Sequence, residues 1–276
     1  MSILSMDLLR FVFWNVNIKD LTYSVCALAK STKADVIILA ENLVRSHRTL
    51  GALRQDVNEQ FFIPNVISES RFHCFSRDAN LDLSEVHSAN RISIRRWKLG
   101  TEKALLVLVH GVDIRNHDRE TRQSFAEYIA GEIRFVSKEQ KIKNIVVMGD
   151  FNMNPYDPGM NIARGLNAMM TRKCVARGVR QHTGGKYDLY YNPMWSLFGD
   201  NSKGPAGTVY DTSSQGPYGW NILDQVIIHH SLVPFFKDVK ILSAVDGQSF
   251  ANRYGRPDKK NVSDHFPILT EFRRTK

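Results

Sequence analysis

The fold of this chain is decided at residues 144–155, where the sequence reads NIVVMGDFNMNP. The largely apolar residues 144–148 predict a buried strand, which continues through Gly149 into Asp150. Asn152 follows two residues later. A carboxylate and an amide at the end of a buried strand can bind a metal or move a proton, although either residue alone is as typical of a turn. The other strands decide between these two interpretations.

Six other short apolar runs also predict buried strands, and most of them carry a polar residue at one end. Some of these polar residues follow the strand and others precede it. The predicted strands cover residues 9–14, 35–40, 91–97, 104–109, 225–229 and 266–272. Asn15 follows strand 9–14, Glu41 follows strand 35–40, and His110 follows strand 104–109. Asp224 precedes strand 225–229, and Asp264 and His265 precede strand 266–272.

The polar strand ends meet at one edge of the sheets if the last two strands run antiparallel to the others. The carboxylates of Glu41, Asp150, Asp224 and Asp264 would then repel one another or recruit a cation. Oxygen ligands of this kind suit Mg²⁺, which keeps several waters and needs only one or two carboxylates. Each residue by itself also has an ordinary role, as a cap, a turn residue or a structural histidine. Because six strand ends share the pattern, coincidence explains it poorly, and it indicates a site.

Helical periodicity separates some of the strands. Asp20 can cap one helix, Asp118 or Thr121 opens a second, and a third is expected over residues 158–170. The strands and helices do not alternate strictly, which predicts two packed sheets with helices on the outside. No repeat or linker divides the chain, so we expect one domain over residues 1–276.

Residues 178–221 differ in composition from the rest of the chain. They are rich in Gly and Pro, with aromatic residues between them, and they predict a long irregular loop. A loop of this length inside a compact domain is often functional. Its aromatic residues, Trp195 among them, can stack on bases or form a small satellite core.

The composition is that of a globular protein with an anionic partner. Hydrophobic residues make up 43% of the chain and charged residues 24%, which excludes global disorder. The net charge of +9 favours nucleic acid as the partner, because phosphate contacts need Lys and Arg. Two basic runs, within residues 91–98 and 172–180, can supply such contacts, or each can be a solvated face.

Cysteine usage and hydropathy favour a reducing, aqueous compartment. Cys26, Cys74 and Cys174 are far apart and form neither a disulfide framework nor a metal motif. The first residues lack a basic region before their apolar stretch, and no apolar run is long enough to cross a membrane. We therefore expect a cytoplasmic monomer without a membrane span.

Segments along nearly the whole chain resemble, in order, the motifs of the endonuclease/exonuclease/phosphatase superfamily, which includes pancreatic-type deoxyribonuclease and AP endonucleases. The resemblance implies an α/β fold, a four-layer sandwich of two packed mixed β-sheets flanked by helices. It also implies cleavage of a phosphoester with Mg²⁺ or Mn²⁺. The matching segments are FWNVN (13–17), DVIILAEN (35–42), LVLVHG (106–111), VVMGDFNMNP (146–155), WNILDQVII (220–228) and SDHFPI (263–268).

The resemblance implies a role for each matching residue. Glu41 looks like the principal metal ligand, with Asn15 and Asp264 beside it. Asp150 resembles the residue that orients or deprotonates the attacking water. His265 resembles the histidine that binds the scissile phosphate.

Three further residues also match the family, and a fourth departs from it. Asp224 looks like the carboxylate that supports the phosphate-binding histidine, and Asn152 looks like a contact to a phosphate oxygen. His110 matches the second histidine of the deoxyribonuclease and sphingomyelinase branches, an acid for the leaving group. Asn17 is a departure, because some nucleases have Asp at this position, and it weakens any second metal site.

We therefore expect a metal-dependent phosphodiesterase that hydrolyses DNA or RNA by in-line attack of water, with Asn17, Arg91 and Trp195 in contact with the substrate. A phosphatase or phosphodiesterase acting on a small-molecule or lipid phosphate is the alternative, since a basic pocket serves that chemistry too. A third interpretation is a nucleic-acid-binding module without activity, against which the intact set of acidic residues and histidines argues.

Overall fold

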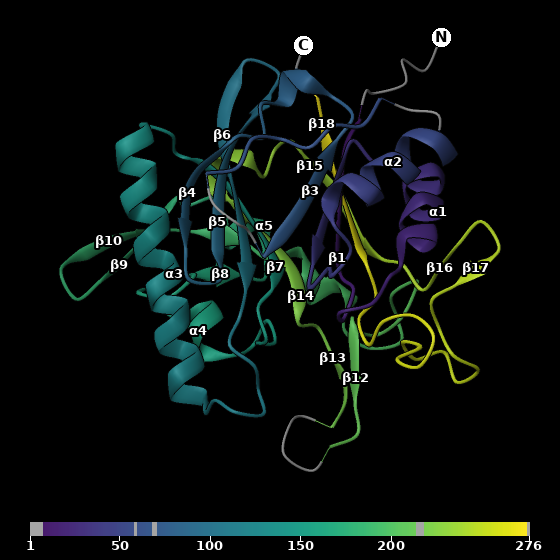
Figure 1. Ribbon diagram of the computed structural model, residues 1–276. Helices are drawn as coiled ribbons and strands as arrows, with labels where there is room; N and C mark the ends of the chain where they lie inside the picture. Colours follow the sequence, from purple (N-terminus) through teal and green to yellow (C-terminus); the bar gives the residue numbers. More distant parts are fainter. Residues whose placement is uncertain (1–7, 58–59, 68–70, 214–217, 275–276) are drawn as a thin grey trace, which may run out of the picture.

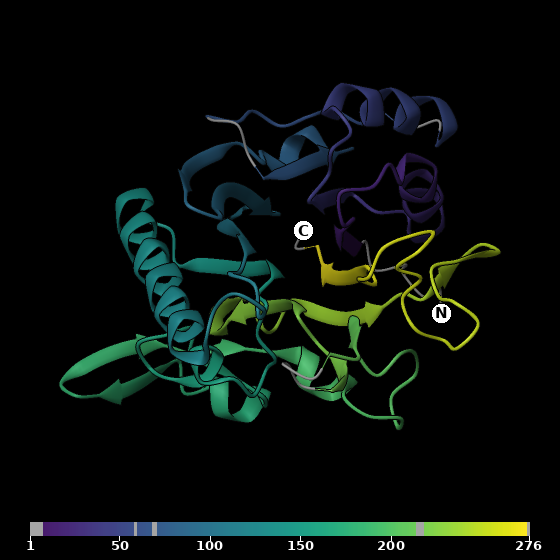
Figure 2. The same cartoon turned by 60° about the horizontal axis from the view of Figure 1, so that its bottom comes forward.

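Two β-sheets packed face to face form the centre of the molecule, and helices cover their outer faces (Figures 1 and 2). The computed structural model describes residues 8–57, 60–67, 71–213 and 218–274. This architecture is the four-layer α/β sandwich of two mixed sheets that the sequence predicts.

The first sheet has five strands in the order β15-β18-β1-β2-β3. β1 is parallel to β2 and antiparallel to β18, so the ends of β1 and β2 lie at the same edge as the beginning of β18. Helices α1 and α2 cover the outer face of this sheet (Figure 1). The elements are β1 (Leu8–Asn15), α1 (Thr22–Thr32), β2 (Val36–Ala40), α2 (Ser46–Asp56), β3 (Phe72–Ser76), β15 (Phe236–Ile241) and β18 (Ile268–Arg273).

The second sheet has seven strands in the order β4-β5-β6-β7-β14-β11-β8. β6 is parallel to β7 and β14 is antiparallel to it, so that Asp150 lies opposite His110 on one side and opposite Asp224 on the other. Helix α3 covers the outer face (Figure 1). The elements are β4 (Glu85–Ala89), β5 (Ile92–Leu99), β6 (Glu102–His110), α3 (Arg119–Gln140), β7 (Asn144–Asp150), β8 (Ala168–Met169), β11 (Tyr190–Tyr191) and β14 (Asp224–His229).

Aromatic side chains fill the space between the two sheets. Phe11 of β1, Trp97 of β5 and Phe272 of β18 contact one another, with ring centroids 5.2, 5.7 and 6.0 Å apart, and all three are fully buried. Burying a large apolar side chain stabilises a fold by about 2–3 kcal/mol. This core fixes one sheet against the other, and with it the polar strand ends at their shared edge.

Helix α3 packs on the second sheet through one apolar stripe, as its periodicity predicts. Ile129, Ile133 and Val136 are buried in the cluster that the helix shares with this sheet. Asp118 caps the helix, because its carboxylate accepts a hydrogen bond of 2.7 Å from the backbone N–H of Thr121. The helix thereby supports β6 and β7 from outside.

Two predictions about the middle of the chain are wrong. The helix expected over residues 158–170 is one turn long, α4 (Pro158–Asn161), because the backbone becomes extended at Ile162 and left-handed at Asn167. The segment 178–221 is not one irregular loop either: it contains the hairpin β9 (Val179–His182) and β10 (Gly185–Asp188), β11, the 3-10 helix η2 (Pro193–Leu197), and the paired strands β12 (Val209–Asp211) and β13 (Gly219–Asn221).

The aromatic residues of β11 belong to the core. Tyr190 is buried in the cluster under α3, and Tyr191 is buried in the cluster between the sheets, as alternation along a strand requires. The remaining elements are η1 (Ala79–Leu81), α5 (Arg172–Val175), η3 (His230–Leu232), β16 (Ala244–Val245) and β17 (Gln248–Ser249).

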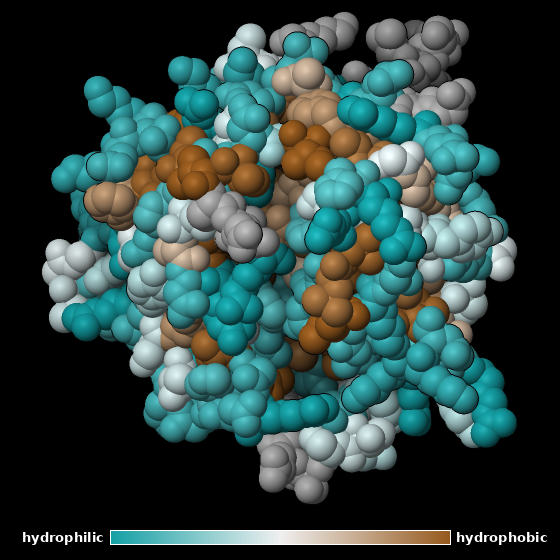
Figure 3. Space-filling model, in the orientation of Figure 1, coloured by the Kyte–Doolittle hydropathy of each residue, from teal (hydrophilic) through white to brown (hydrophobic). Residues whose placement is uncertain are grey.

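The face shown in Figure 3 is mostly hydrophilic, with its hydrophobic areas in separate patches. Among the residues that the structure describes, no helix is long and apolar enough to cross a membrane.

Cys26, Cys74 and Cys174 are free thiols, in agreement with their spacing, and burial raises the pKa of Cys26 to about 12.

Candidate active site

The polar strand ends converge on one open cleft, with a volume of about 600 Å³, bordered by residues of β12. Asn15 and Asp224 lie buried behind it and contact residues that line it. The other residues assigned to the chemistry by the sequence all line the cleft, together with Asn17: they are Glu41, His110, Asp150, Asn152, Asp264 and His265.

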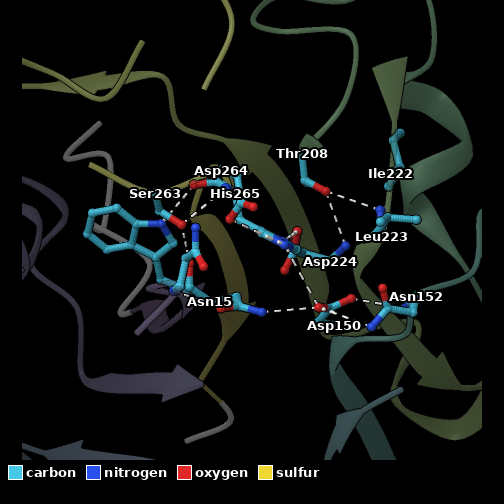
Figure 4. A network of polar contacts seen from close by, with 12 residues as sticks. Asn15, Asp150, Asn152, Thr208, Ile222, Leu223, Asp224, Ser263, Asp264 and His265 are labelled. Atoms are coloured by element: carbon cyan, nitrogen blue, oxygen red, sulfur yellow. Dashed lines mark hydrogen bonds and ion pairs between the residues drawn. The ribbon is translucent and has the colours of Figure 1, made fainter. Parts of the chain in front are cut away.

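Asp224 and His265 form a buried pair. Nδ1 of His265 lies 2.8 Å from Oδ2 of Asp224, whose side chain is completely buried. This contact leaves Nε2 of His265 for the cleft, where it lies 4.0 Å from Oδ2 of Asp150 (Figure 4). Burial alone would lower the pKa of His265, but the carboxylates of Asp224, Asp150 and Asp264 outweigh it and raise the pKa to about 10. His265 is therefore a cation at neutral pH.

A loop before β18 holds His265, as the adjacency of Asp264 and His265 predicts. The hydroxyl of Ser263 accepts a hydrogen bond of 3.1 Å from the backbone N–H of His265, and it donates one of 2.7 Å to the backbone carbonyl of Asn15. The indole N–H of Trp14 donates to the carbonyl of His265 at 2.9 Å. The end of β1 thus positions the histidine loop (Figure 4).

Asp150 lies at the junction of the two sheets. Its Oδ1 accepts a hydrogen bond of 2.9 Å from the backbone N–H of Asn152, and its Oδ2 accepts one of 3.1 Å from Nδ2 of Asn15. The second bond joins the first sheet to the second (Figure 4). Nδ2 of Asn152 also lies 3.5 Å from Oδ2 of Asp150, so the carboxylate is held in one orientation.

Tight turns, and not extended strand ends, orient the side chains of Asn152 and Asn17. The spacing of two residues between Asp150 and Asn152, and between Asn15 and Asn17, would place each pair on one face of an extended backbone, but the backbone is not extended at Asn152 or Asn17. Asn152 and Asn17 have φ angles of 50° and 48°. Asn tolerates this left-handed conformation better than most residues, which allows a tight turn directly after each strand.

Glu41 follows β2 and contacts both His110 and Asn15. Its Oε1 lies 3.1 Å from Nε2 of His110 and 3.1 Å from Nδ2 of Asn15. The hydrogen bond with His110 and the one with Asn15 outweigh the effect of burial and hold the pKa of Glu41 at about 2. Nδ1 of His110 is buried and has no hydrogen-bond partner in the described part of the chain.

Two glycines allow β6 and β7 to come this close at their ends. A Cβ atom on Gly149 would lie 1.9 Å from the carbonyl oxygen of Val109, and one on Gly111 would lie 2.1 Å from the carbonyl oxygen of Phe151. Any larger residue at either position must push the backbones apart, and with them the functional groups at the strand ends.

The donor set of the cleft fits a divalent metal ion. Glu41 is ionised at neutral pH, and its Oε2 accepts no hydrogen bond from the part of the chain that the structure describes. Asp264 adds a second, partly exposed carboxylate, and Asn15 adds an amide. Asp150, Asp224 and His265 also lie close enough to hold an ion, but they already bind one another and Asn15. Mg²⁺ and Mn²⁺ prefer such oxygen donors.

The three residues expected to contact the substrate lie in different surroundings. Asn17 lines the cleft, and its backbone N–H donates to Oδ1 of Asn15 at 3.0 Å. Arg91 donates to the carbonyl of Gly111 at 3.1 Å, beside the end of β6. Trp195 lies in η2 against Phe198 and does not line the cleft. Substrate contact at all three positions stays a prediction.

The basic run 91–98 is not one surface. Alternation along β5 leaves Arg96 exposed and turns Arg95 inward, where it is fully buried. Arg95 donates to the carbonyl of Leu83 at 3.2 Å and lies 3.9 Å from Glu85. Arg95 therefore serves the core and is not available to a phosphate.

The sequence did not single out three further residues at the cleft or behind it. Oγ1 of Thr208 accepts hydrogen bonds of 3.1 Å from the backbone N–H groups of Leu223 and Asp224, which fixes the start of β14. Arg115 and Lys259 line the cleft as cations. Thr208 lies in the Gly- and Pro-rich segment that the composition marks as functional, whereas no sequence signal distinguishes Arg115 and Lys259 from other surface cations.

The two packed sheets, with a polar cleft at their shared edge, define the endonuclease/exonuclease/phosphatase fold. The chain is similar to truncated TDP2 from Caenorhabditis elegans, with 17% identity, a TM-score of 0.57 and coverage of 96% of this chain and 97% of that one. It is also similar to D. rerio TDP2 complexed with a single-strand DNA product, with 16% identity, a TM-score of 0.54 and coverage of 96% of this chain and 99% of that one. For an AP endonuclease from Archaeoglobus fulgidus the identity is 15% and the TM-score 0.55, with coverage of 96% of this chain and 99% of that one. No protein-family model and no curated protein matches the chain. At these identities the likeness establishes the fold.

Proposed function

We propose that this chain is a phosphodiesterase that depends on Mg²⁺ or Mn²⁺ and hydrolyses a nucleic acid, DNA or RNA. One observation carries the proposal. A carboxylate suited to a metal, a second carboxylate suited to a water molecule and a cationic imidazole come from separate strand ends and face one cleft. The three residues are Glu41, Asp150 and His265.

The proposal gives a task to each group. Asp150, held by Asn15 and Asn152, orients and deprotonates the attacking water on the face opposite the leaving group. His265 presents the N–H at Nε2 to a phosphate oxygen, and its positive charge stabilises the charge that develops in the transition state. A divalent ion held by Glu41, Asn15 and Asp264 would supply further charge stabilisation at phosphate oxygens.

The two remaining polar residues act at the phosphate and at the leaving group. Nδ2 of Asn152 is the proposed donor to a second phosphate oxygen. His110 is the proposed acid for the leaving group, with Glu41 3.1 Å from its Nε2. Catalysis then rests on donors and charges that are already in place before the substrate arrives, since backbone and side-chain hydrogen bonds fix them.

Charges and aromatic groups around the cleft support a nucleic-acid substrate over a small phosphate. Arg115 and Lys259 can contact phosphates on either side of the bond to be cleaved, and the ring of Tyr210, which packs against Arg256 and Trp220, also lines the cleft. The net charge of +9 agrees with this, and D. rerio TDP2 has been solved with a single-strand DNA product. A monomeric, cytoplasmic enzyme is part of the same proposal.

Incubation of the pure protein with Mg²⁺ and a panel of substrates tests the proposal. The panel contains single- and double-stranded DNA, RNA, inositol phosphates and sphingomyelin. We expect cleavage of a nucleic acid that is lost in Asp150→Asn and after removal of the metal by a chelator. If only the small or lipid phosphates are cleaved, the substrate is one of these and not a nucleic acid. Binding of nucleic acid without cleavage of any substrate would identify a binding module.

Salt dependence tests the partner separately from the chemistry. The affinity of inactive Asp150→Asn for a nucleic acid should fall steeply with salt, because each phosphate contact adds about 0.9 to the slope of log K against log salt. Arg115→Ala should lower that slope by about 1. A flat response contradicts a nucleic-acid partner. Arg91→Ala and Trp195→Ala, measured in the same assay, test the two predicted contacts outside the cleft.

A further inference from the structure

A second group of ligand-type side chains lies at the other end of β14. The strand begins at Asp224 and ends at His229, which places His229 about 17 Å along the strand from the cleft. His230 begins η3, and Asp188 ends β10. One donor atom from each of Asp188, His229 and His230 lies within 4.8 Å of the other two. The proposed function uses none of these residues.

Hydrogen bonds fix the ring of His229 and leave one nitrogen free. Nδ2 of Asn144 donates to the carbonyl of Lys103, so its Oδ1 accepts the hydroxyl of Ser231 at 2.6 Å. Oγ of Ser231 therefore accepts from Nδ1 of His229 at 2.7 Å, a much shorter contact than the 3.4 Å between the backbone N–H of Ser231 and the same nitrogen, and this puts the proton of the neutral ring on Nδ1. The lone pair is then on Nε2, which is buried, has no hydrogen-bond partner among the described residues, and lies 3.7 Å from Oδ2 of Asp188.

An imidazole lone pair that faces a carboxylate is unfavourable unless a cation lies between them. The separation of 3.7 Å between Nε2 of His229 and Oδ2 of Asp188 suits a bridging ion. In a tetrahedral Zn²⁺ site with bonds of about 2.1 Å, neighbouring donor atoms lie about 3.4 Å apart. The side chain of Asp188 is 55% exposed, so it is able to make this small adjustment.

His230 supplies the third donor. Its ring centroid lies 4.1 Å from that of His229. A strand would send two adjacent side chains to opposite faces, and the rings meet because the strand ends between them.

Backbone hydrogen bonds hold the three residues near one another. The N–H of His230 donates to the carbonyl of Leu189 at 3.1 Å, directly after Asp188. Tyr190 lies opposite His229 in the antiparallel pair β11–β14. The chain between β10 and β11 therefore brings Asp188 to the two histidines before any ion binds.

We propose that Asp188, His229 and His230 form a second metal site, which takes Zn²⁺ or a similar transition-metal ion and leaves a fourth position to solvent. Two imidazoles and one carboxylate favour such ions over Mg²⁺, which prefers oxygen donors. The Nδ1–H of His229 bonded to Ser231 is the kind of outer contact that orients metal-binding histidines. The bound ion ties the hairpin β9–β10 to the end of β14.

Calorimetric titration of the full chain with Zn²⁺, in excess Mg²⁺, tests the site. The excess Mg²⁺ would fill the proposed site of oxygen donors in the cleft, and it does not compete at imidazoles. We expect one equivalent of Zn²⁺ to bind, and Asp188→Asn and His230→Gln each to weaken this binding at least about 10-fold. His182→Gln, which changes an exposed histidine of the same hairpin, is the matched control and should bind Zn²⁺ as the unchanged chain does.

Co²⁺ absorption and thermal unfolding provide independent measurements. Co²⁺ should give the intense visible bands of a four-coordinate ion, and Asp188→Asn should lose them. Zn²⁺ at 100 times its Kd should raise the Tm by about 5 °C in the unchanged chain and much less in His230→Gln. The proposal is overturned if Zn²⁺ does not bind in excess Mg²⁺, or if it binds equally well to Asp188→Asn and His230→Gln. Phosphodiesterase activity in Asp188→Asn should be unchanged.

Discussion

Two histidines face the same cleft but are held in opposite ways. His265 uses Nδ1 to bind Asp224, 2.8 Å away in fully buried surroundings, and keeps Nε2 for the cleft. His110 uses Nε2 to contact Glu41 at 3.1 Å, while its buried Nδ1 has no hydrogen-bond partner in the residues that the structure describes. A dedicated carboxylate supports the first ring. The second ring shares its carboxylate with the proposed metal.

The difference lies in where the carboxylate partner of each ring is placed. Asp224 is buried behind the cleft and makes the largest contribution to the raised pKa of His265, and Asp150 and Asp264 add to it from the cleft. His110 depends on Glu41, so a change at the metal ligand also changes the surroundings of this ring. We therefore expect His265 to stabilise transition-state charge directly, and His110 to respond to the state of Glu41.

The largest effect is expected from Glu41→Gln, which removes the anion beside His110 together with a proposed metal ligand. Activity should fall about 10³-fold or more with the fold intact, because Gln has nearly the same shape and only the charge is lost. Calorimetric titration with Mg²⁺ should show much weaker binding. Glu132→Gln, which removes the carboxylate partner of His87 away from the cleft, should leave both quantities unchanged. Unaltered Mg²⁺ affinity in Glu41→Gln would exclude Glu41 from the metal site.

His265→Ala should lower kcat by about 10²-fold or more, because it removes a fixed cation from the charge that develops in the transition state. KM should change much less. Steady-state kinetics on the proposed substrate separates the two quantities. A loss confined to KM would mean that His265 binds the substrate without acting in the chemical step.

Combining this change with Asp224→Asn sharpens the comparison. Asp224→Asn should lose part of the activity that depends on His265, and the double variant should be little worse than His265→Ala alone, because the two side chains act as a unit. Fully additive losses would give Asp224 a task of its own.

The pH dependence of activity tests the cation at His265. Folding raises the pKa of His265 from 6.5 to about 10, so its contribution to stability is fully present below about pH 6.5 and is lost as the pH rises through about 10. Activity that needs this cation should persist through neutral pH and decline near pH 10. In Asp224→Asn the decline should move to lower pH, which a kcat/KM profile measures. An identical basic limb in both proteins would contradict this role of Asp224.

The smallest effect is expected from His110→Asn, a loss in kcat smaller than that of His265→Ala, because the cation at His265 and the proposed metal ligand Glu41 both stay in place. The same change should raise the pKa of Glu41 from about 2 toward its ordinary range, because the hydrogen bond from His110 is the main cause that lowers it. NMR titration of the Glu41 carboxyl carbon checks the second part. A loss of activity as large as that of His265→Ala would end the distinction between the two histidines.

The sequence predicted those parts of the site that depend on sheet topology. Asp224 and His265 are far apart in the chain, but each precedes a strand that runs antiparallel to its neighbour, and this alone placed them at one edge. Likewise, the apolar runs before Asn15 and Asp150 predicted the strands that deliver them. The metal-binding assignment of Glu41, Asn15 and Asp264 stays a prediction that the donor set supports.

The sequence did not predict features that single backbone conformations or tertiary contacts decide. The left-handed turns at Asn17 and Asn152 follow strands whose alternation gives no sign of where it stops. Arg95 is a basic residue in the same run as the exposed Arg96 and Lys98, and only the packing of the second sheet on the first shows that its side chain is buried. In residues 158–170, a hydrogen bond from the N–H of Leu166 to the carbonyl of Gly159 replaces the expected helical pattern.

The pairing of β1 with β18 has a consequence for the time course of folding. Leu8 lies opposite Arg273 and Phe13 lies opposite Ile268, so these neighbouring strands are more than 250 residues apart in the chain. Contacts of such long range are slow to form, because the entropy of closing a large loop is lost before the strands gain their partners. Asn15 and His265 flank this junction, and the cleft exists only once it has closed. During refolding, catalytic activity should therefore return after the helical signal, and it marks the last step of assembly.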